Sequence, residues 1–270
     1  MADGRTARRV VEQHRARDEI AAMAWPFPAI WKSAPPPIFL GDNEVHFWLA
    51  AVPDCLEDFT RLRDVLDAEE RDRAARFHFE RDRERYIVAR GILRLLLSTY
   101  LGSSRFMLTT NEFGKPFLQP PHDTLQFNMS HSRDLALFGF TRRNEIGADV
   151  ERIRPDFATQ EIANRFFAPD EAAALAQLGE SERAGAFFNC WTRKEAYIKA
   201  RGIGLSLGLS TFAVTLRPGE PAALVRVDND ASARGRWTML SLDVGADYRA
   251  AAAFEGRGHV CCFRWGGNPS

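Results

Sequence analysis

The stretch Phe187–Gly204, FFNCWTRKEAYIKARGIG, has the spacing of a helix but carries charges where such a helix is normally apolar. The positions i, i+3, i+4, i+7 and i+8 share one face, and they are occupied by Trp191, Lys194, Glu195, Ile198 and Lys199. If Glu195 and Lys199 simply form an ion pair on the protein surface, the pair would stabilise the helix by only about 0.2–0.5 kcal/mol. Such a pair would also give no reason for Lys194. In the alternative interpretation, Glu195 binds a metal ion or accepts a proton, and both lysines bind phosphate.

The segment Ile146–Glu151, IGADVE, reads as a strand that precedes this helix. Strand alternation places Asp149 and Glu151 on one face and points Val150 into the core. Two carboxylates at one spot suit Mg²⁺, which binds one or two protein carboxylates together with the phosphate oxygens of a substrate. The alternative is an exposed strand end with two solvated acids.

Two turns further upstream offer groups that bind anions. Asn128–Ser132, NMSHS, carries the hydroxyl of Ser130 and the imidazole of His131, which suit a pyrophosphate or a nucleotide phosphate. No G-x-S-x-G elbow surrounds Ser130, which argues against a serine hydrolase. Asn111–Pro116, NEFGKP, reads as a turn whose Lys115 either binds phosphate or is simply exposed.

The pattern of the whole chain predicts an α+β fold built from two similar halves. In the first half, residues 41–145, a strand at Val45–Val52 and a helical stretch at Glu57–Tyr100 precede short strands, which form one antiparallel sheet with Ile146–Val150. The second half, residues 146–270, repeats helices followed by strands. Residues 1–40 form an N-terminal appendage, first a charged helix and then a proline-rich connector.

Composition excludes several classes of protein. Lys plus Arg equals Asp plus Glu, at 36 each, so no overall positive field holds a nucleic acid. The 4 cysteines show no CxxC spacing and the 6 histidines show no HExxH motif or paired zinc arrangement, so we expect reduced, buried thiols. Without a signal peptide in Met1–Trp25, and without an apolar run of about 18–20 residues, we expect a cytoplasmic protein that does not enter a membrane.

Four segments, in the order NEFGKPF, FNMSHS, IGADVE and FFNCWTRKEAYIKARGIGLSL, resemble the Sfp-type (surfactin-type) 4'-phosphopantetheinyl transferases. That family carries G-K-P, N-x-S-H-S, G-x-D-x-E and W-x-x-K-E-A-x-x-K signatures. The likeness spans Val45–Phe254 and leaves the appendage outside. Trp191 with Lys194–Ala196 resembles the W/KEA variety, which points to polyketide, lipid or fatty-acid carriers more than to nonribosomal-peptide enzymes.

The resemblance implies a monomer of two α+β halves related by a pseudo-twofold axis, with coenzyme A and Mg²⁺ bound in the cleft between them. It implies three metal ligands, which are Asp149, Glu151 and Glu195. It also implies two catalytic residues, Glu195 and Lys199. Coenzyme A would be bound by Arg85, Arg90, Lys115, Ser130, His131, Lys194 and Lys199, of which Arg85 or Arg90 joins His131 at the 3'-phosphate.

The activity implied is that of a holo-[acyl-carrier-protein] synthase. A serine of an apo acyl or peptidyl carrier protein attacks the β-phosphorus of coenzyme A and releases 3',5'-ADP, and the enzyme's task is chiefly positioning and charge neutralisation. Two rivals are a non-catalytic module that binds coenzyme A or a carrier, and a magnesium-dependent phosphohydrolase that would cleave coenzyme A without a carrier. The identity of the carrier and the choice of Mg²⁺ or Mn²⁺ stay open.

Overall fold

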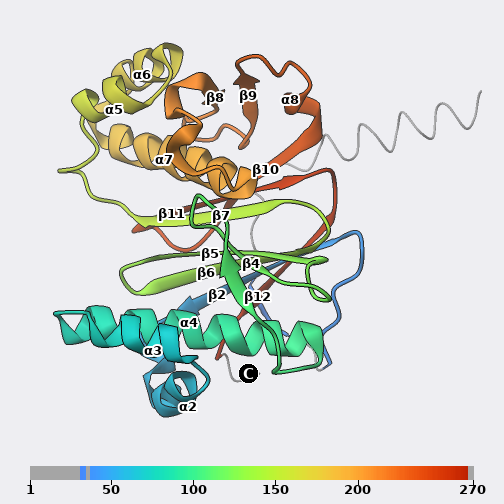
Figure 1. Cartoon of the computed structure of the whole chain (residues 1–270). Helices are drawn as coiled ribbons and strands as arrows, with labels where there is room; N and C mark the ends of the chain where they lie inside the picture. The colour runs from blue at the N-terminus through green and yellow to red at the C-terminus, as the bar shows by residue number, and fades with distance from the viewer. Residues whose placement is uncertain (1–30, 35–36, 267–270) are drawn as a thin grey trace, which may run out of the picture.

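Two β-sheets lie face to face, and a long helix covers the outer face of each (Figure 1). The chain is described by a computed structural model over residues 31–34 and 37–266, so the predicted charged helix of the appendage lies outside the described residues. The larger sheet has the order β1 (Lys32–Ser33), β12 (His259–Arg264), β2 (Glu44–Ala51), β6 (Leu135–Arg142), β5 (Leu125–Ser132). The smaller has the order β10 (Trp237–Leu242), β11 (Tyr248–Glu255), β7 (Ile146–Arg152).

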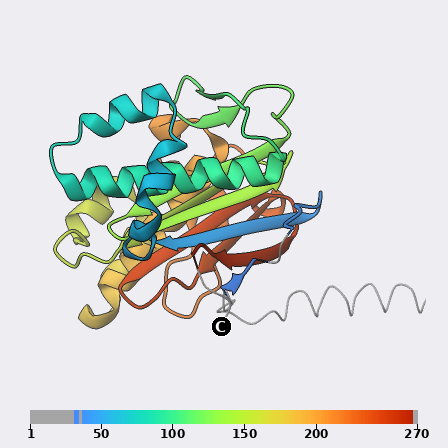
Figure 2. The same ribbon diagram turned by 90° about the horizontal axis from the view of Figure 1, so that it is seen from below.

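Strand β2 shows how the sequence fills the layers. Its residues alternate between two cores, so that Val45 and Phe47 lie between the sheets while Trp48 and Ala50 face α4 (Glu80–Leu101). Because both faces are covered, the strand reads as a nearly continuous apolar run. Figure 2 shows α4 crossing this sheet, and a third core fills the space between the smaller sheet and α7 (Glu180–Arg201).

The two long helices are alike, which agrees with two similar halves. Each has 22 residues, and each ends at a glycine with φ of 63°, Gly102 after α4 and Gly202 after α7. That left-handed conformation is the usual helix end at which glycine is favoured. The mixed helices and sheets confirm the α+β class.

Several predicted elements differ from the structure. The stretch Glu57–Tyr100 is divided into η1 (Pro53–Asp58), α2 (Phe59–Asp64), α3 (Ala68–Ala75) and α4, because the side chain of Asp67 caps α3 and begins a new helix. The prediction of one antiparallel sheet in the first half was wrong. Strand β7 belongs to the smaller sheet, and β3 (Leu108–Thr110) pairs only with β4 (Pro116–Leu118).

The remaining elements cover the outer side of α7 and follow the predicted order (Figure 1). They are α5 (Gln160–Phe166), α6 (Pro169–Ala176), η2 (Gly204–Ser206), η3 (Leu209–Thr211), β8 (Phe212–Val214), β9 (Leu224–Val227) and the short α8 (Ala233–Arg236). Within the described residues, no helix is long and apolar enough to cross a membrane.

The C-terminal strand crosses from one half to the other. Strand β12 pairs in parallel with β2, with Val260 opposite Val45, so it joins the sheet of the first half between β1 and β2. The division into residues 41–145 and 146–270 remains a prediction, and β12 departs from it.

Helix α7 and strand β7 approach closely at Gly147. A Cβ atom at Gly147 would overlap the carbonyl oxygen of Ala196 and the backbone nitrogen of Ala200. These are backbone atoms of a packed helix and cannot turn aside. The missing side chain therefore sets how deeply α7 sits on β7.

We expect Gly147→Ala to lower the free energy of unfolding by about 3 kcal/mol or more, since overpacking against backbone forces the helix away from the strand. Gly235→Ala is the matched control, because no described residue outside its own helix and its chain neighbours lies within 4 Å of the added Cβ, and it should change stability by about 0.5 kcal/mol or less. Urea unfolding followed by tryptophan fluorescence measures both. Equal stability of the two variants would contradict the close packing.

Candidate functional site

The three predicted metal ligands lie near one another between β7 and α7. Asp149 is buried, and burial together with the negative charges of Asp149 and Glu151 raises the pKa of Glu195 to about 6. Burial is also the main reason that the pKa of Glu151 is raised, and the charge of Asp149 adds to it. The ligand atoms of the three residues do not all come within 4.8 Å of one another. They nevertheless form one cluster of negative charge.

The two oxygens of Asp149 have different surroundings. Its Oδ1 accepts a hydrogen bond from Ser130 Oγ at 2.9 Å and one from Lys199 Nζ at 2.6 Å. Its Oδ2 is buried and has no hydrogen-bond partner among the described residues. A buried carboxylate oxygen left in this way costs about 1–3 kcal/mol or more. An unpaired oxygen among three carboxylates fits a hard cation such as Mg²⁺, which prefers oxygen ligands.

The N-x-S-x-S pattern of β5 joins the two sheets. Strands β5 and β7 belong to different sheets, and side-chain oxygens of β5 accept hydrogen bonds from the backbone N–H groups of β7. The pairs are Asn128 with Ala148 at 2.9 Å, Ser130 with Val150 at 3.4 Å, and Ser132 with Arg152 at 3.1 Å. Ser130 therefore positions Asp149 and Lys199, whereas the sequence predicted a phosphate contact.

Beside the carboxylates lies a group of positive charges around the exposed His131. Burial of part of the ring, followed by the charges of Lys199, Arg85 and Arg73, lowers the pKa of His131. Arg85 is fixed there by Asp134 at 2.6 Å and Asp82 at 3.2 Å. The structure therefore brings Arg85, His131 and Lys199 together. Arg73 was missed, although it lies in a stretch, residues 71–94, that contains 8 arginines.

Two family models match the chain in adjoining segments. The "4'-phosphopantetheinyl transferase superfamily" model matches residues 145–253, and the "4'-phosphopantetheinyl transferase, N-terminal" model matches residues 53–139. Among curated proteins, the chain is 35% identical over 232 residues to the 4'-phosphopantetheinyl transferase HetI of Nostoc sp. strain PCC 7120, covering 84% of this chain and 94% of HetI. The chain belongs to the Sfp-type 4'-phosphopantetheinyl transferase family.

Other relatives agree over shorter spans. The 4'-phosphopantetheinyl transferase Sfp of Bacillus subtilis strain 168 is 33% identical over 162 residues, covering 59% of this chain and 70% of Sfp. The phosphopantetheinyl transferase of a Thraustochytrium species is 31% identical over 198 residues, covering 68% of each chain. The predictions of the family and of the enzyme class are thus confirmed.

Lys194 of this transferase does not join the site. Its side chain is fully buried, and its ammonium forms an ion pair with Glu171 at 2.7 Å and donates to the carbonyl oxygens of Leu209 and Phe212 at 2.7 and 2.5 Å. Five helical positions separate Lys194 from Lys199, and at 3.6 residues per turn they point about 140° apart. The predicted phosphate contact at Lys194 was therefore wrong, and this lysine joins α7 to α6 and β8.

Lys115 and Arg90 also have structural partners in place of the predicted phosphates. Lys115 Nζ donates to the carbonyl oxygens of Ala200 at 2.8 Å and Ile146 at 3.3 Å, and burial lowers its pKa to about 8. It thereby holds the G-K-P turn against the end of α7. Arg90 Nε donates to the buried Glu70 at 2.8 Å and fixes α3 on α4.

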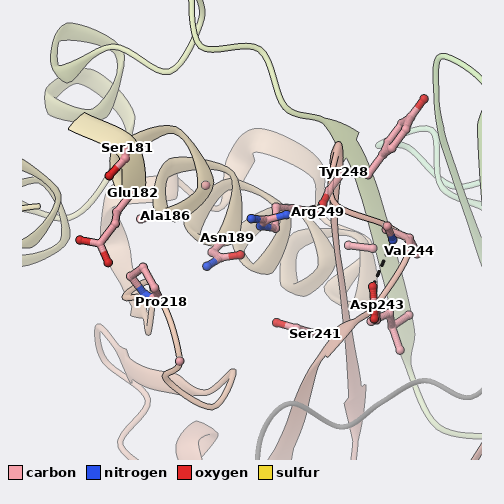
Figure 3. Close-up of a pocket in the computed structure, with 15 residues that line it drawn as sticks. Ser181, Glu182, Ala186, Asn189, Pro218, Ser241, Asp243, Val244, Tyr248 and Arg249 are labelled. Carbon is pink, nitrogen blue, oxygen red and sulfur yellow. Dashed lines mark hydrogen bonds between the residues drawn. The ribbon is translucent and has the colours of Figure 1, made fainter. Parts of the chain in front are cut away.

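A cavity of about 460 Å³ lies at the other end of α7 (Figure 3). It is lined by the start of α7, the loop at Pro218 and the turn between β10 and β11, and Arg249 points into it. One guanidinium nitrogen of Arg249 donates hydrogen bonds to the carbonyl oxygens of Ala246, in that turn, and of Tyr248, at the start of β11. None of the predicted site residues lines this cavity.

We expect Glu195→Gln to stabilise the metal-free transferase at alkaline pH. The folded pKa of Glu195 is about 6 against an ordinary 4.5, so ionisation opposes folding, and wild-type stability falls as pH rises from about 4.5 through 6. In EDTA the variant should exceed the wild type by up to about 2 kcal/mol above pH 7 and match it below pH 4.5. Urea unfolding at a series of pH values measures this, and a variant less stable at pH 8 would contradict it.

A second substitution tests the structural role of Lys194. Lys194→Met leaves Glu171 buried and unpaired, so the free energy of unfolding should fall by about 3–5 kcal/mol. Lys32→Met, at an exposed lysine, is the control and should change it by about 0.5 kcal/mol or less. Chemical denaturation checks both variants. A Lys194→Met protein that is as stable as the wild type but binds coenzyme A more weakly would contradict the structural role and support the predicted phosphate contact.

Proposed function

We propose that this transferase moves the phosphopantetheine arm of coenzyme A to a serine of an apo acyl or peptidyl carrier protein and releases 3',5'-ADP. The serine oxygen forms a bond to the β-phosphorus, the bridging P–O bond of the pyrophosphate breaks, and the serine proton passes to a base. The observation that carries the proposal is the buried, unpaired Oδ2 of Asp149 among three carboxylates, beside a group of positive charges. A monomer in the cytoplasm remains the expectation.

Asp149, Glu151 and Glu195 would hold Mg²⁺. Bound there, it would neutralise the charge of the pyrophosphate oxygens. Their oxygen-only donor set and mutual repulsion support this assignment, because a divalent cation relieves both. Ser130 and Ser132 support the ligands from β5, since their hydroxyls donate to Asp149 at 2.9 Å and to Glu151 at 2.7 Å.

Lys199 is suited to bind the phosphate that leaves with ADP. An ammonium group has three N–H donors, and two of them are directed at Ser130 Oγ, at 3.0 Å, and at Asp149 Oδ1. The third is available to a phosphate oxygen. The same lysine would therefore contact both a carboxylate of the site and the substrate.

Glu195 is suited to accept the proton of the carrier serine. A carboxylate whose pKa is raised to about 6 is a stronger base than an ordinary glutamate and is still ionised near neutral pH. Its place beside Asp149 also suits a metal ligand.

The decisive experiment follows the intact mass of an apo carrier protein incubated with the enzyme, coenzyme A and Mg²⁺. We expect the carrier to gain one phosphopantetheine mass, and EDTA to prevent this. Asp149→Asn should lower the rate by about 100-fold or more, since loss of the metal removes several kcal/mol of transition-state stabilisation. Asp156→Asn, at an exposed aspartate, should retain full activity.

The other outcomes of that experiment distinguish the alternatives. Release of 3',5'-ADP without any carrier would indicate a phosphohydrolase. Binding of coenzyme A without turnover, across several apo carriers, would indicate a binding module. Normal turnover by Asp149→Asn would contradict the metal site.

The positive charges around His131 predict how coenzyme A is recognised. Arg85 and Arg73 lie close enough to lower the pKa of His131, and this arrangement suits the 3'-phosphate. We expect His131→Ala to raise KM for coenzyme A about 10-fold or more, as for loss of one charged hydrogen bond. It should leave KM for 3'-dephospho-coenzyme A unchanged, and steady-state kinetics with both substrates measure the difference. An equal change for both would contradict this recognition.

A further inference from the structure

A second group of ligand-type side chains lies on the seam between β2 and β12. In the parallel pairing His259 lies opposite Glu44, and Cys261 lies opposite His46. Residues two apart on a strand share a face, so these four side chains form a two-by-two array. Cys261 packs against the core beneath α4, whereas its neighbour Cys262 faces the core between the sheets. Strand β6 separates this seam from β5 and the carboxylate site.

Three of these side chains have the spacing of metal ligands. One ligand atom each from Glu44, His259 and Cys261 lies within 4.8 Å of the other two, and no other such group occurs in the described part of the chain. The thiol of Cys261 is 3.4 Å from Nδ1 of His259. A tetrahedral ion with bonds of about 2.0–2.3 Å holds its ligand atoms roughly 3.3–3.8 Å apart. Small side-chain rotations would therefore complete the site.

A chain of polar contacts that starts at the buried Trp48 and Tyr100 orients Glu44. The indole N–H of Trp48 donates to the hydroxyl of Tyr100 at 2.8 Å, which leaves the hydroxyl proton for Nδ1 of His46 at 2.9 Å. The ring proton of His46 is then on Nε2, which lies 3.4 Å from Glu44 Oε2. The same oxygen accepts the backbone N–H of Gly41 at 2.8 Å. Outer hydrogen bonds of this kind are typical of the ligands in protein metal sites.

We propose that Glu44, His259 and Cys261 bind one Zn²⁺, with water as the fourth ligand and His46 as a positioning residue. A thiolate with an imidazole and a carboxylate selects Zn²⁺, whereas Mg²⁺ requires oxygen ligands. On binding, the sulfur of Cys261 exchanges its proton for the metal, and the proton goes to solvent. The ion joins the C-terminal strand to β2, so it fastens the strand that crosses between the halves.

The test is a titration of the metal-stripped full chain with Co²⁺, whose spectrum reports a cysteine ligand. We expect one equivalent of Co²⁺ to produce a thiolate-to-cobalt charge-transfer band that Zn²⁺ then removes. Cys261→Ser should lose the band, while Cys262→Ala is the matched control and should keep it. Competition with a chromogenic chelator should show Zn²⁺ binding weakened about 10–100-fold in His46→Ala, as for loss of an outer hydrogen bond.

Stability and activity provide independent measurements. Zn²⁺ should raise the thermal unfolding midpoint of the wild type but not that of Cys261→Ser, and circular dichroism confirms that the variant is folded. Because Cys261 lies outside the proposed catalytic machinery, this variant should keep carrier modification. A band retained in Cys261→Ser, or no one-to-one metal binding by the wild type, would overturn the proposal whatever the fate of the proposed function.

Discussion

The contact between Asp149, Lys199 and Ser130 is the interaction on which the site depends. It joins β7, α7 and β5, three elements that belong to different layers, around a single carboxylate oxygen. Lys199 pairs with Oδ1 of Asp149, whereas Oδ2 of the same carboxylate is buried without a partner among the described residues. A group this costly to bury persists because the packing of α7 at Gly147 and the side-chain hydrogen bonds from β5 fix it. We propose that a bound cation relieves this cost.

The layered architecture separates the two proposed metal sites by chemistry as well as by position. The carboxylate cluster offers only oxygen atoms and lies where the two sheets meet α7. The Glu44, His259 and Cys261 group offers oxygen, nitrogen and sulfur, and lies on the seam that attaches β12 to β2. This difference in ligand type is enough for the two sites to select different metal ions. The first would serve the transfer reaction, and the second would hold the chain's last strand in the first half's sheet.

The sequence predicts the elements and the central carboxylates well, because strand alternation and helical spacing are local. Helical spacing places Lys194 and Lys199 at opposite edges of one stripe, about 140° apart, but only packing shows that Lys194 meets Glu171 and Lys199 meets Asp149. The role of Ser130 depends on β7 lying beside β5 without backbone pairing. The group of Glu44, His259 and Cys261 cannot be recognised from the spacing of residues in the sequence, because its ligands come from β2 and β12, which are more than 200 residues apart in the chain.

The measurement that tests the central claim most directly is Mn²⁺ binding followed by electron paramagnetic resonance in the presence of coenzyme A. Mn²⁺ prefers oxygen ligands and stands in for Mg²⁺. The account predicts one bound ion per chain in the wild type and in Cys261→Ser, and loss of that ion in Asp149→Asn. Unchanged binding in Asp149→Asn, or no bound ion in the wild type, would contradict the claim that the buried oxygen of Asp149 takes a divalent cation.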